Sequence, residues 1–173
     1  MKISVNRFKI IIAVLSLVFV GIDQLIKYIV ANGMQLGQSI PIINNVIHIT
    51  YVLNDGAAFS FMSGQTWLLC GVTSVIMGIL IWIFISQKSK HFLDVCALGL
   101  IISGGIGNLI DRFFNGDTLF HGKVIDYVDF RLINFAVFNF ADCCVVIGTI
   151  LLVIFLLFYD KEKPAEIEES LDE

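Results

Sequence analysis

Four apolar runs, each about as long as a helix that spans a lipid bilayer, constrain this chain more than any other feature. They cover about residues 8–30, 67–86, 95–112 and 138–159, and a spanning helix needs roughly 20 mostly apolar residues. The chain is 57% hydrophobic with a mean hydropathy of +0.88, which is more than a soluble domain of this size can bury. The sequence therefore predicts an all-α membrane protein with four transmembrane helices.

The remaining segments define the domain organisation. Residues 1–159 form a single integral-membrane domain, with two long loops at about 31–66 and 113–137. Residues 160–173 contain seven acidic residues and two lysines, so the net charge of -4 is a property of this tail. A charged segment without aromatic residues cannot bury an apolar core, and we expect the tail to be disordered and cytoplasmic.

Basic residues lie mainly on one side of the predicted spans. Seven of them precede the first span, join the second and third spans or follow the fourth span: Lys2, Arg7, Lys9, Lys88, Lys90, Lys161 and Lys163. The opposite loops contain Lys123 and Arg131, and Arg112 lies at a boundary. Because basic loops stay in the cytoplasm, we expect a multi-pass protein with both termini cytoplasmic and the two long loops outside.

The first long loop has the pattern of a β-hairpin. Residues 40–53 are rich in β-branched side chains and contain a central Asn44-Asn45 turn signal. His48 lies within this pattern, and a single histidine in a strand is more often structural than catalytic. We therefore expect a short hairpin at the membrane surface and assign no chemistry to His48.

Two aspartates are the strongest candidates for chemistry. Asp126 follows Val124-Ile125, and Asp142 lies at the start of the fourth apolar run. A carboxylate near a membrane is costly and is commonly functional. Two carboxyls near one membrane face can share a proton and activate water, as in an aspartic protease. We call Asp126 and Asp142 the aspartate pair.

Further polar residues fall in the same layer as the aspartate pair once the chain is threaded through the membrane. They are Asp23 in the first span, Asn108, Asp111 and Arg112 at the end of the third span, and Asn139 at the start of the fourth. Each also has a structural explanation: Asp23 could pair with Lys27 one turn away, and the others could cap helices or meet headgroups. Their occurrence in one layer favours a site.

Functions of other classes also place acidic residues in membranes. A proton-coupled transporter would use intramembrane carboxylates, but typically near the bilayer centre and with internal repeats. A metal-dependent lipid transferase could use Asp111, Asp126 and Asp129. A structural scaffold would leave the aspartate pair unexplained. The four cysteines lie within or beside apolar runs without metal-ligand spacing, so neither a metal site nor another cofactor is expected.

Five motifs in this order resemble those of the lipoprotein signal peptidases, the type II signal peptidases of bacteria. They are Asp23-Gln24-x-x-Lys27, Asn54-Asp55-Gly56-Ala57-Ala58-Phe59, Gly104-Gly105-Ile106-Gly107-Asn108-Leu109-Ile110-Asp111-Arg112, Val124-Ile125-Asp126-Tyr127 and Phe138-Asn139-Phe140-Ala141-Asp142. The resemblance covers nearly the whole chain except its acidic tail.

The resemblance implies an aspartic endopeptidase with a small extracytoplasmic β-cradle beside its four helices. Asp126 and Asp142 would be catalytic, and the residues that bind substrate or support the pair would be Asp23, Asn54, Asn108, Asp111, Arg112 and Asn139. The enzyme would cleave diacylglyceryl-modified prolipoproteins before the lipidated cysteine, near the outer face of the bacterial cytoplasmic membrane. The expected partners are this substrate and membrane lipid, without nucleic acid, and the protein is expected to be a monomer.

The two aspartates are also expected to differ in protonation. Asp142 lies at a helix N-terminus, where the helix dipole stabilises a negative charge. We therefore predict that Asp142 holds the charge while Asp126 carries the proton.

Overall fold

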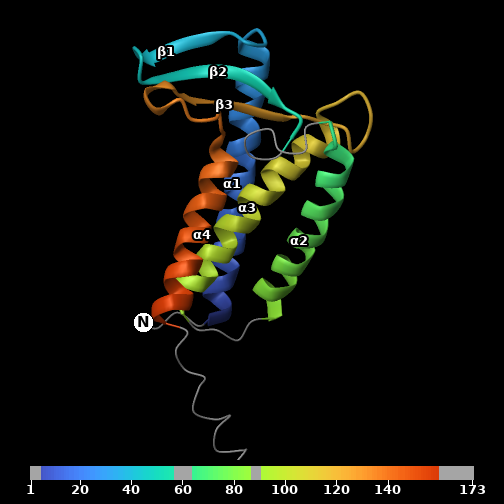
Figure 1. Cartoon of the computed structure of the whole chain (residues 1–173). Coiled ribbons are helices and arrows are strands. Elements are labelled where there is room, and N and C mark those ends of the chain that lie inside the picture. The colour runs from blue at the N-terminus through green and yellow to red at the C-terminus, as the bar shows by residue number, and fades with distance from the viewer. Residues whose placement is uncertain (1–4, 57–63, 87–90, 160–173) are drawn as a thin grey trace, which may run out of the picture.

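The protein is a bundle of helices with a small sheet at one end (Figure 1). The computed structural model describes residues 5–56, 64–86 and 91–159. Within them the helices are α1 (Val5–Gly33), α2 (Thr66–Ser86), α3 (Phe92–Phe114) and α4 (Phe140–Phe158). All four are long and apolar enough to cross a membrane, which confirms the predicted membrane protein with four spanning helices. The predicted disordered tail at 160–173 lies outside the described residues.

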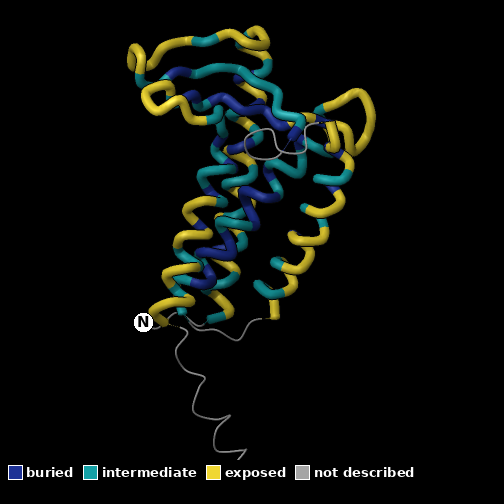
Figure 2. Tube along the Cα trace, viewed as in Figure 1, coloured by how far each residue is buried: buried dark blue, intermediate teal, exposed yellow. Residues whose placement is uncertain are grey.

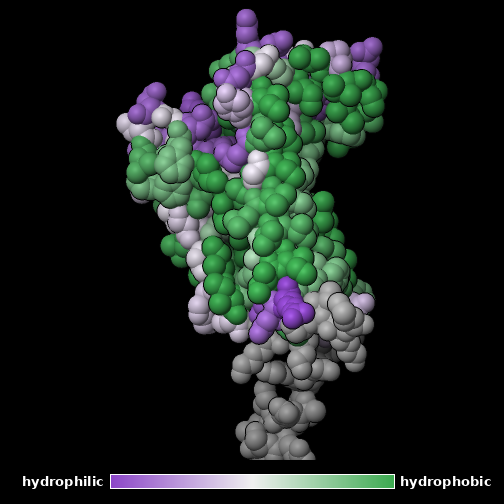
Figure 3. Space-filling view, turned by 180° about the vertical axis from the view of Figure 1, so that it is seen from behind, coloured by the Kyte–Doolittle hydropathy of each residue, from purple (hydrophilic) through white to green (hydrophobic). Residues whose placement is uncertain are grey.

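Helix α3 is the centre of the bundle. Of the most apolar 18-residue stretch of α3, 61% is buried inside the protein. The corresponding share is between 6% and 17% in each of the other three helices. It packs against α1, α2 and α4, and the buried residues follow its length (Figure 2). The other helices expose large apolar side chains such as Leu17, Trp82 and Ile85. The face of the bundle seen in Figure 3 is hydrophobic over most of its length, which fits a lipid environment.

Several helix ends differ from the predicted spans. Helices α1 and α3 extend beyond 8–30 and 95–112, because charged residues near their ends are tolerated at a membrane surface. Helix α4 begins at Phe140 instead of residue 138, because Asn139 caps it: the Asn139 side chain accepts a hydrogen bond from the backbone N–H of Asp142. Phe138 instead forms a β-bridge with Val128.

The sheet has three antiparallel strands in the order β1-β2-β3. Strands β1 (Ser39–Ile43) and β2 (Ile47–Asn54) form the predicted hairpin, and Asn45 in its turn has a φ of 60°. Strand β3 (Val124–Phe130) continues into a short 3-10 helix, η2 (Arg131–Ile133). The register places Val52 opposite Asp126 and Asn54 opposite Val124. The second long loop therefore returns to the hairpin and brings Asp126 beside Asn54.

Close contact between α3 and α4 depends on glycine. A Cβ at Gly148 would lie 2.8 Å from the carbonyl oxygen of Ala97, 2.8 Å from Cγ1 of Ile101 and 2.9 Å from the backbone nitrogen of Ile101. Two of these three atoms are backbone, which cannot move as easily as the end of a flexible side chain. The two helices can approach this closely because Gly148 has no side chain.

We predict that Gly148→Ala lowers the free energy of unfolding by about 1–3 kcal/mol, the usual effect of overpacking. The matched control is Gly78→Ala on α2, where an added Cβ would meet nothing within 4 Å. Thermal unfolding of the purified protein in detergent measures both variants. Equal unfolding temperatures for Gly148→Ala and Gly78→Ala would contradict the close approach of α3 and α4.

Candidate active site

The predicted site residues converge where the sheet meets the ends of α1, α3 and α4. The most deeply buried are Asn139, Asp23, Asp126 and Asp111, with 0%, 1%, 2% and 4% of their surface exposed. A buried carboxylate needs hydrogen bonds or a counter-charge. The partners of each carboxylate therefore define the site.

Asp126 is held by two asparagine amides. Asn54 Nδ2 donates to Asp126 Oδ2 at 3.0 Å, and Asn139 Nδ2 donates to Oδ1 at 2.7 Å. The first contact follows from the sheet: Asn54 and Asp126 are diagonal neighbours on one face of the β2–β3 pair. Both carboxyl oxygens of Asp126 are therefore engaged by neutral donors.

Asp142 is held by the start of its own helix and by α3. Its Oδ2 accepts a hydrogen bond from the backbone N–H of Asn139 at 3.0 Å, which completes a capping box. Its Oδ1 accepts a bond from Asn108 Nδ2 at 2.8 Å. The carboxylate lies in the first turn of α4, where the helix dipole stabilises negative charge.

Asn139 connects the two members of the aspartate pair. Its side-chain amide donates to Asp126, and its backbone N–H donates to Asp142. Its Oδ1 accepts the backbone N–H of Asp142 at 2.9 Å, which directs Nδ2 away from the helix and toward Asp126. The two carboxyls, 16 residues apart in the chain, are thus bridged by a single asparagine.

The surroundings of Asp126 favour its protonated form. Burial and then the nearby carboxylate of Asp142 raise the pKa of Asp126 to about 6. The hydrogen bonds from Asn54 and Asn139 and the charge of Lys27 oppose this rise. An acid with a pKa of about 6 beside a second carboxyl can both give and accept a proton near neutral pH.

Asp23 and Asp111 are two further buried carboxylates of the site, and both contact Lys27. Lys27 Nζ is 2.8 Å from Asp23 Oδ2 and 2.8 Å from Asp111 Oδ2, and all three side chains are almost fully buried. Asp23 also accepts the backbone N–H of Ala141 at 3.1 Å, and Asp111 accepts that of Ile125 at 3.2 Å. Each carboxylate therefore holds the residue immediately before one member of the aspartate pair.

One glycine makes room for Asp23. A Cβ at Gly107 would lie 2.6 Å from Asp23 Oδ2, so a larger residue there would displace the carboxylate.

Arg112 is a second basic residue of the site. Arg112 donates from Nη2 to the carbonyl of Gly56 at 3.0 Å and from Nη1 to the carbonyl of Asn108 at 3.4 Å. Its buried Nε has no hydrogen-bond partner among the described residues. Arg112 therefore links α3 to the chain that follows β2.

Lys27 and Gln24 also belong to this network, although neither was predicted from the sequence as a site residue. Gln24 Nε2 lies 3.2 Å from Asp23 Oδ2 and 3.1 Å from Asp111 Oδ1, so it bridges the same two carboxylates as Lys27. The available signal was the i, i+4 spacing of Asp23 and Lys27 within an apolar span. That spacing is also explained by a simple ion pair, and only the fold shows that α3 adds a second carboxylate.

Asp129 and His48 lie apart from this network. Asp129 Oδ2 accepts bonds from Thr50 at 2.7 Å and Arg131 at 2.9 Å. Although burial alone would raise the pKa of Asp129, these two bonds and the charge of Arg131 lower it overall. His48 Nδ1 lies 3.1 Å from Ser39 Oγ, in the β1–β2 hairpin. The set of Asp111, Asp126 and Asp129 considered for a metal is therefore not brought together.

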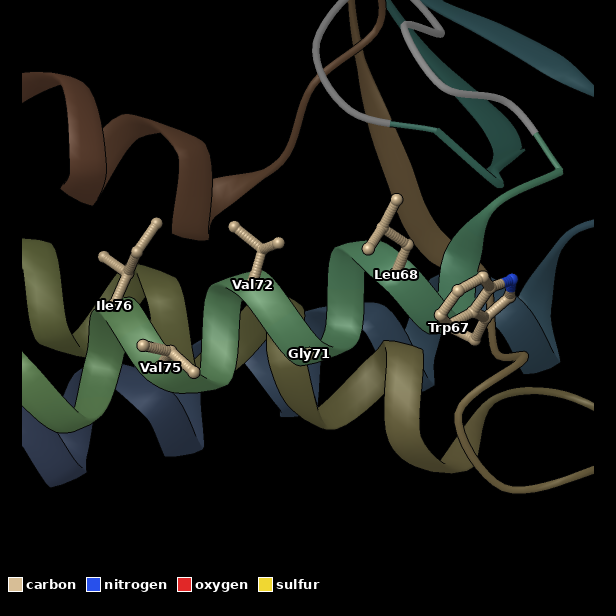
Figure 4. A pocket seen from close by; sticks show the side chains of 6 residues that line it. All are labelled: Trp67, Leu68, Gly71, Val72, Val75 and Ile76. Atoms are coloured by element: carbon tan, nitrogen blue, oxygen red, sulfur yellow. The ribbon is translucent and has the colours of Figure 1, made fainter.

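One surface hollow is lined by none of the predicted site residues. It follows one face of α2 and is lined by apolar side chains and one glycine: Trp67, Leu68, Gly71, Val72, Val75 and Ile76 (Figure 4). It contains no titratable group. Among the described residues, no group of three or more His, Cys, Asp or Glu side chains could hold a metal ion.

Comparison with known proteins places this geometry in a family context. A family model described as "Signal peptidase (SPase) II" matches residues 15–158. Proteins named "Lipoprotein signal peptidase" from Desulfitobacterium hafniense and Clostridioides difficile are each 39% identical to the chain. The alignments cover 83% and 84% of this chain and 90% and 94% of the two relatives.

Solved structures are similar as well. One, described as "Bacterial membrane enzyme structure by the in meso method at 2.3 A resolution", has a TM-score of 0.77 and 33% identity. The match covers 91% of this chain and 92% of the chain in that structure. A second structure, described in the same words at 1.9 A resolution, has a TM-score of 0.73 and 34% identity. The match covers 87% of this chain and 93% of the chain in that structure.

We predict that Asn54→Ala raises the pKa of Asp126 above its value of about 6, because the lost hydrogen bond stabilises the charged carboxylate. Infrared titration of the protonated carboxyl stretch measures this pKa, with Asp126→Asn identifying the band. Asn44→Ala in the exposed β1–β2 turn is the control. An unchanged or lower pKa in Asn54→Ala would show that this amide does not stabilise the charge.

Proposed function

The chain belongs to the signal peptidase II family, and we propose that Asp126 and Asp142 are the carboxyls with which it cleaves its substrate. The protein is a membrane protease that removes signal peptides from prolipoproteins. The proton-coupled transporter considered from the sequence has no support in these matches. The observation that carries the assignment of the aspartate pair is Asn139, which donates to both carboxyls.

The proposed mechanism uses one protonated and one charged carboxyl. Asp142 takes a proton from a water molecule as the water oxygen attacks the carbonyl carbon of the scissile peptide bond. Asp126 gives its proton to the carbonyl oxygen, and a tetrahedral diol forms. Asp142 then gives its proton to the amide nitrogen and Asp126 recovers one from the diol, so the C–N bond breaks to an acid and an amine. The raised pKa of Asp126 supports its assignment as the first proton donor.

The six supporting residues have distinct proposed roles. Asn54, Asn108 and Asn139 fix the orientation of the two carboxyls through their amides. Asp23 and Asp111 hold the backbone before each catalytic residue. Arg112 interacts electrostatically with Asp142 and Asp126. Arg112 also donates a hydrogen bond to the carbonyl of Gly56, in the chain that follows β2. We therefore propose that Arg112 connects this segment, on the side where substrate would bind, to the aspartate pair.

The position of the site supports a lipid-modified substrate. Asp126 lies on β3 and Asp142 in the first turn of α4, and the spanning helices expose many large apolar side chains. A peptide bearing a diacylglyceryl-modified cysteine can approach through lipid while its scissile bond reaches the pair. The proposed cleavage precedes that cysteine. The protein is proposed to act as a monomer among membrane lipids.

The proposed orientation places the site at the outer face of the cytoplasmic membrane. The sheet and the start of α1 lie at opposite ends of the bundle (Figure 1). Arg7 and Lys9 lie at that start, and basic residues favour the cytoplasm. The other five basic residues that we expect in the cytoplasm, all lysines, lie outside the described residues. Four spans then return the C-terminus to the cytoplasm as well.

We predict that Asp126→Asn and Asp142→Asn each lower cleavage of a diacylglyceryl-modified prolipoprotein by about 1,000-fold or more, since each removes a proton-transfer group. Wild-type protein should remain active with a chelator present. Asp129→Asn is the matched control, because Asp129 lies on the same strand as Asp126 but bonds to Thr50 and Arg131. Full cleavage by Asp126→Asn or Asp142→Asn would refute the assignment of the pair.

Orientation has a separate test in intact cells. A single cysteine replacing Asn44, in a background without the four native cysteines, should react with a membrane-impermeant maleimide added outside. A cysteine replacing Val5, at the opposite end of the bundle, should react only after the membrane is permeabilised. Labelling in the reverse order would place the site in the cytoplasm.

A further inference from the structure

Lys27 makes one contact that ion pairing does not explain. Its ammonium has three N–H donors, and Nζ has three acceptors at hydrogen-bond distance. Two are the carboxylates of Asp23 and Asp111, each at 2.8 Å. The third is Oδ1 of Asn108, a neutral amide, at 2.9 Å. Lys27 is 1% exposed, so water does not compete for any of these bonds.

The Asn108 amide is the only side-chain group that touches both Lys27 and Asp142 among the described contacts. Its Oδ1 accepts from Lys27 Nζ and from Asn139 Nδ2, the latter at 3.0 Å. Its Nδ2 therefore points the other way and donates to Asp142 Oδ1 at 2.8 Å. Rotation of this amide by 180° would direct N–H groups at the ammonium and an oxygen at a carboxylate, both unfavourable.

We propose that Lys27 is a positioning residue that fixes the direction of the Asn108 amide and thereby stabilises the charged form of Asp142. Lys27 does not touch the reacting atoms and acts through Asn108. This inference rests on the proposed function of the aspartate pair. It adds a physical reason why the proton of the pair resides on Asp126.

The other charged groups around Lys27 define what a test must control. Asp23 on α1 and Asp111 on α3 contact it directly, and Asp126 on β3 interacts with its charge. Asp142 on α4 is reached through Asn108. Among the described residues, Arg112 on α3 is the other basic group near the pair, and it interacts electrostatically with Asp142, Asp126 and Asp111. Arg112 is unchanged in every variant below, so a change in the pair is attributable to Lys27.

The test is the pH dependence of kcat/KM for Lys27→Met, which has a side chain of similar length without charge or donor. The acid limb of this profile marks uptake of a second proton by the aspartate pair. Because Lys27→Met removes both the positive charge and the constraint on Asn108, the acid limb should move to higher pH by about 0.5–1 unit. KM should change less than about threefold, since Lys27 is only 1% exposed and is not expected to contact a bound peptide.

A double-mutant cycle separates action through Asn108 from the effect of charge alone. In an Asn108→Leu background, Lys27→Met should move the acid limb by less than half of its shift in the wild-type background. An equal shift in both backgrounds would overturn the role of Asn108. No shift in the wild-type background, with folded and active protein, would overturn the role of Lys27.

Removal of Lys27 leaves two buried carboxylates without their counter-ion, so a charge-balanced variant is also needed. Asp23→Asn/Lys27→Met removes one charge of each sign and should shift the acid limb upward relative to Asp23→Asn alone. Thermal unfolding establishes that each variant is folded.

A spectroscopic measurement on folded protein completes the test if neither Lys27 variant folds. Asp142 contributes to the raised pKa of Asp126, so the infrared spectra are recorded well below pH 6. Under these conditions, protein with ¹³C-labelled aspartate should lose the protonated carboxyl band in Asp126→Asn and retain it in Asp142→Asn. Loss of the band in Asp142→Asn only would overturn the proposed stabilisation of charged Asp142. Cleavage that persists in Asp126→Asn would instead refute the proposed function, so the two failures are distinguishable.

Discussion

The pairing of buried charge is the constraint on which the rest of this structure depends. Carboxylates at the membrane end of a helical bundle are tolerated only when donors or counter-charges surround them. Lys27 meets this requirement by joining Asp23 on α1 to Asp111 on α3 at 2.8 Å each. The same two carboxylates accept the backbone N–H groups of Ala141 and Ile125. The two carboxylates paired with Lys27 thus also hold the residue immediately before each member of the aspartate pair.

The aspartate pair is built on this framework by amides, and among the described residues no additional charged group is in direct contact with it. Asn139, at the N-terminus of α4, donates to both carboxyls and is fully buried. Neutral donors orient carboxyls without forcing both to ionise, whereas a lysine in the same place would favour two negative charges. Asn54 and Asn108 contribute in the same way from β2 and α3. This arrangement is compatible with a single shared proton, as the proposed mechanism requires.

Much of the fold was predictable because the membrane simplifies the problem. A run of about 20 apolar residues has few alternatives to a spanning helix, and the Asn44-Asn45 turn marks the hairpin. Strand β3 was less accessible, because Asp126 and Asp129 interrupt its apolar pattern, although Val124, Ile125 and Val128 are typical strand residues. The start of α4 depends on a capping box formed by Asn139 and Asp142. Both residues were chosen from the sequence as site residues, and a position at a helix end was considered for them as well, but the reciprocal hydrogen bonds of the box were not predicted.

The sequence by itself determined the four spans, the layer of polar residues near one membrane face and the choice of Asp126 and Asp142. These follow from local composition and from the high energy of a charge in lipid. Only the tertiary structure decided which amide meets which carboxyl and that Lys27 serves two acids and an asparagine. Those contacts join residues as far apart as Asn54 and Asp126, 72 positions, or Asp23 and Ala141, 118 positions. Hydrogen bonds require atomic distances and directions, which depend on helix packing and strand register instead of local pattern.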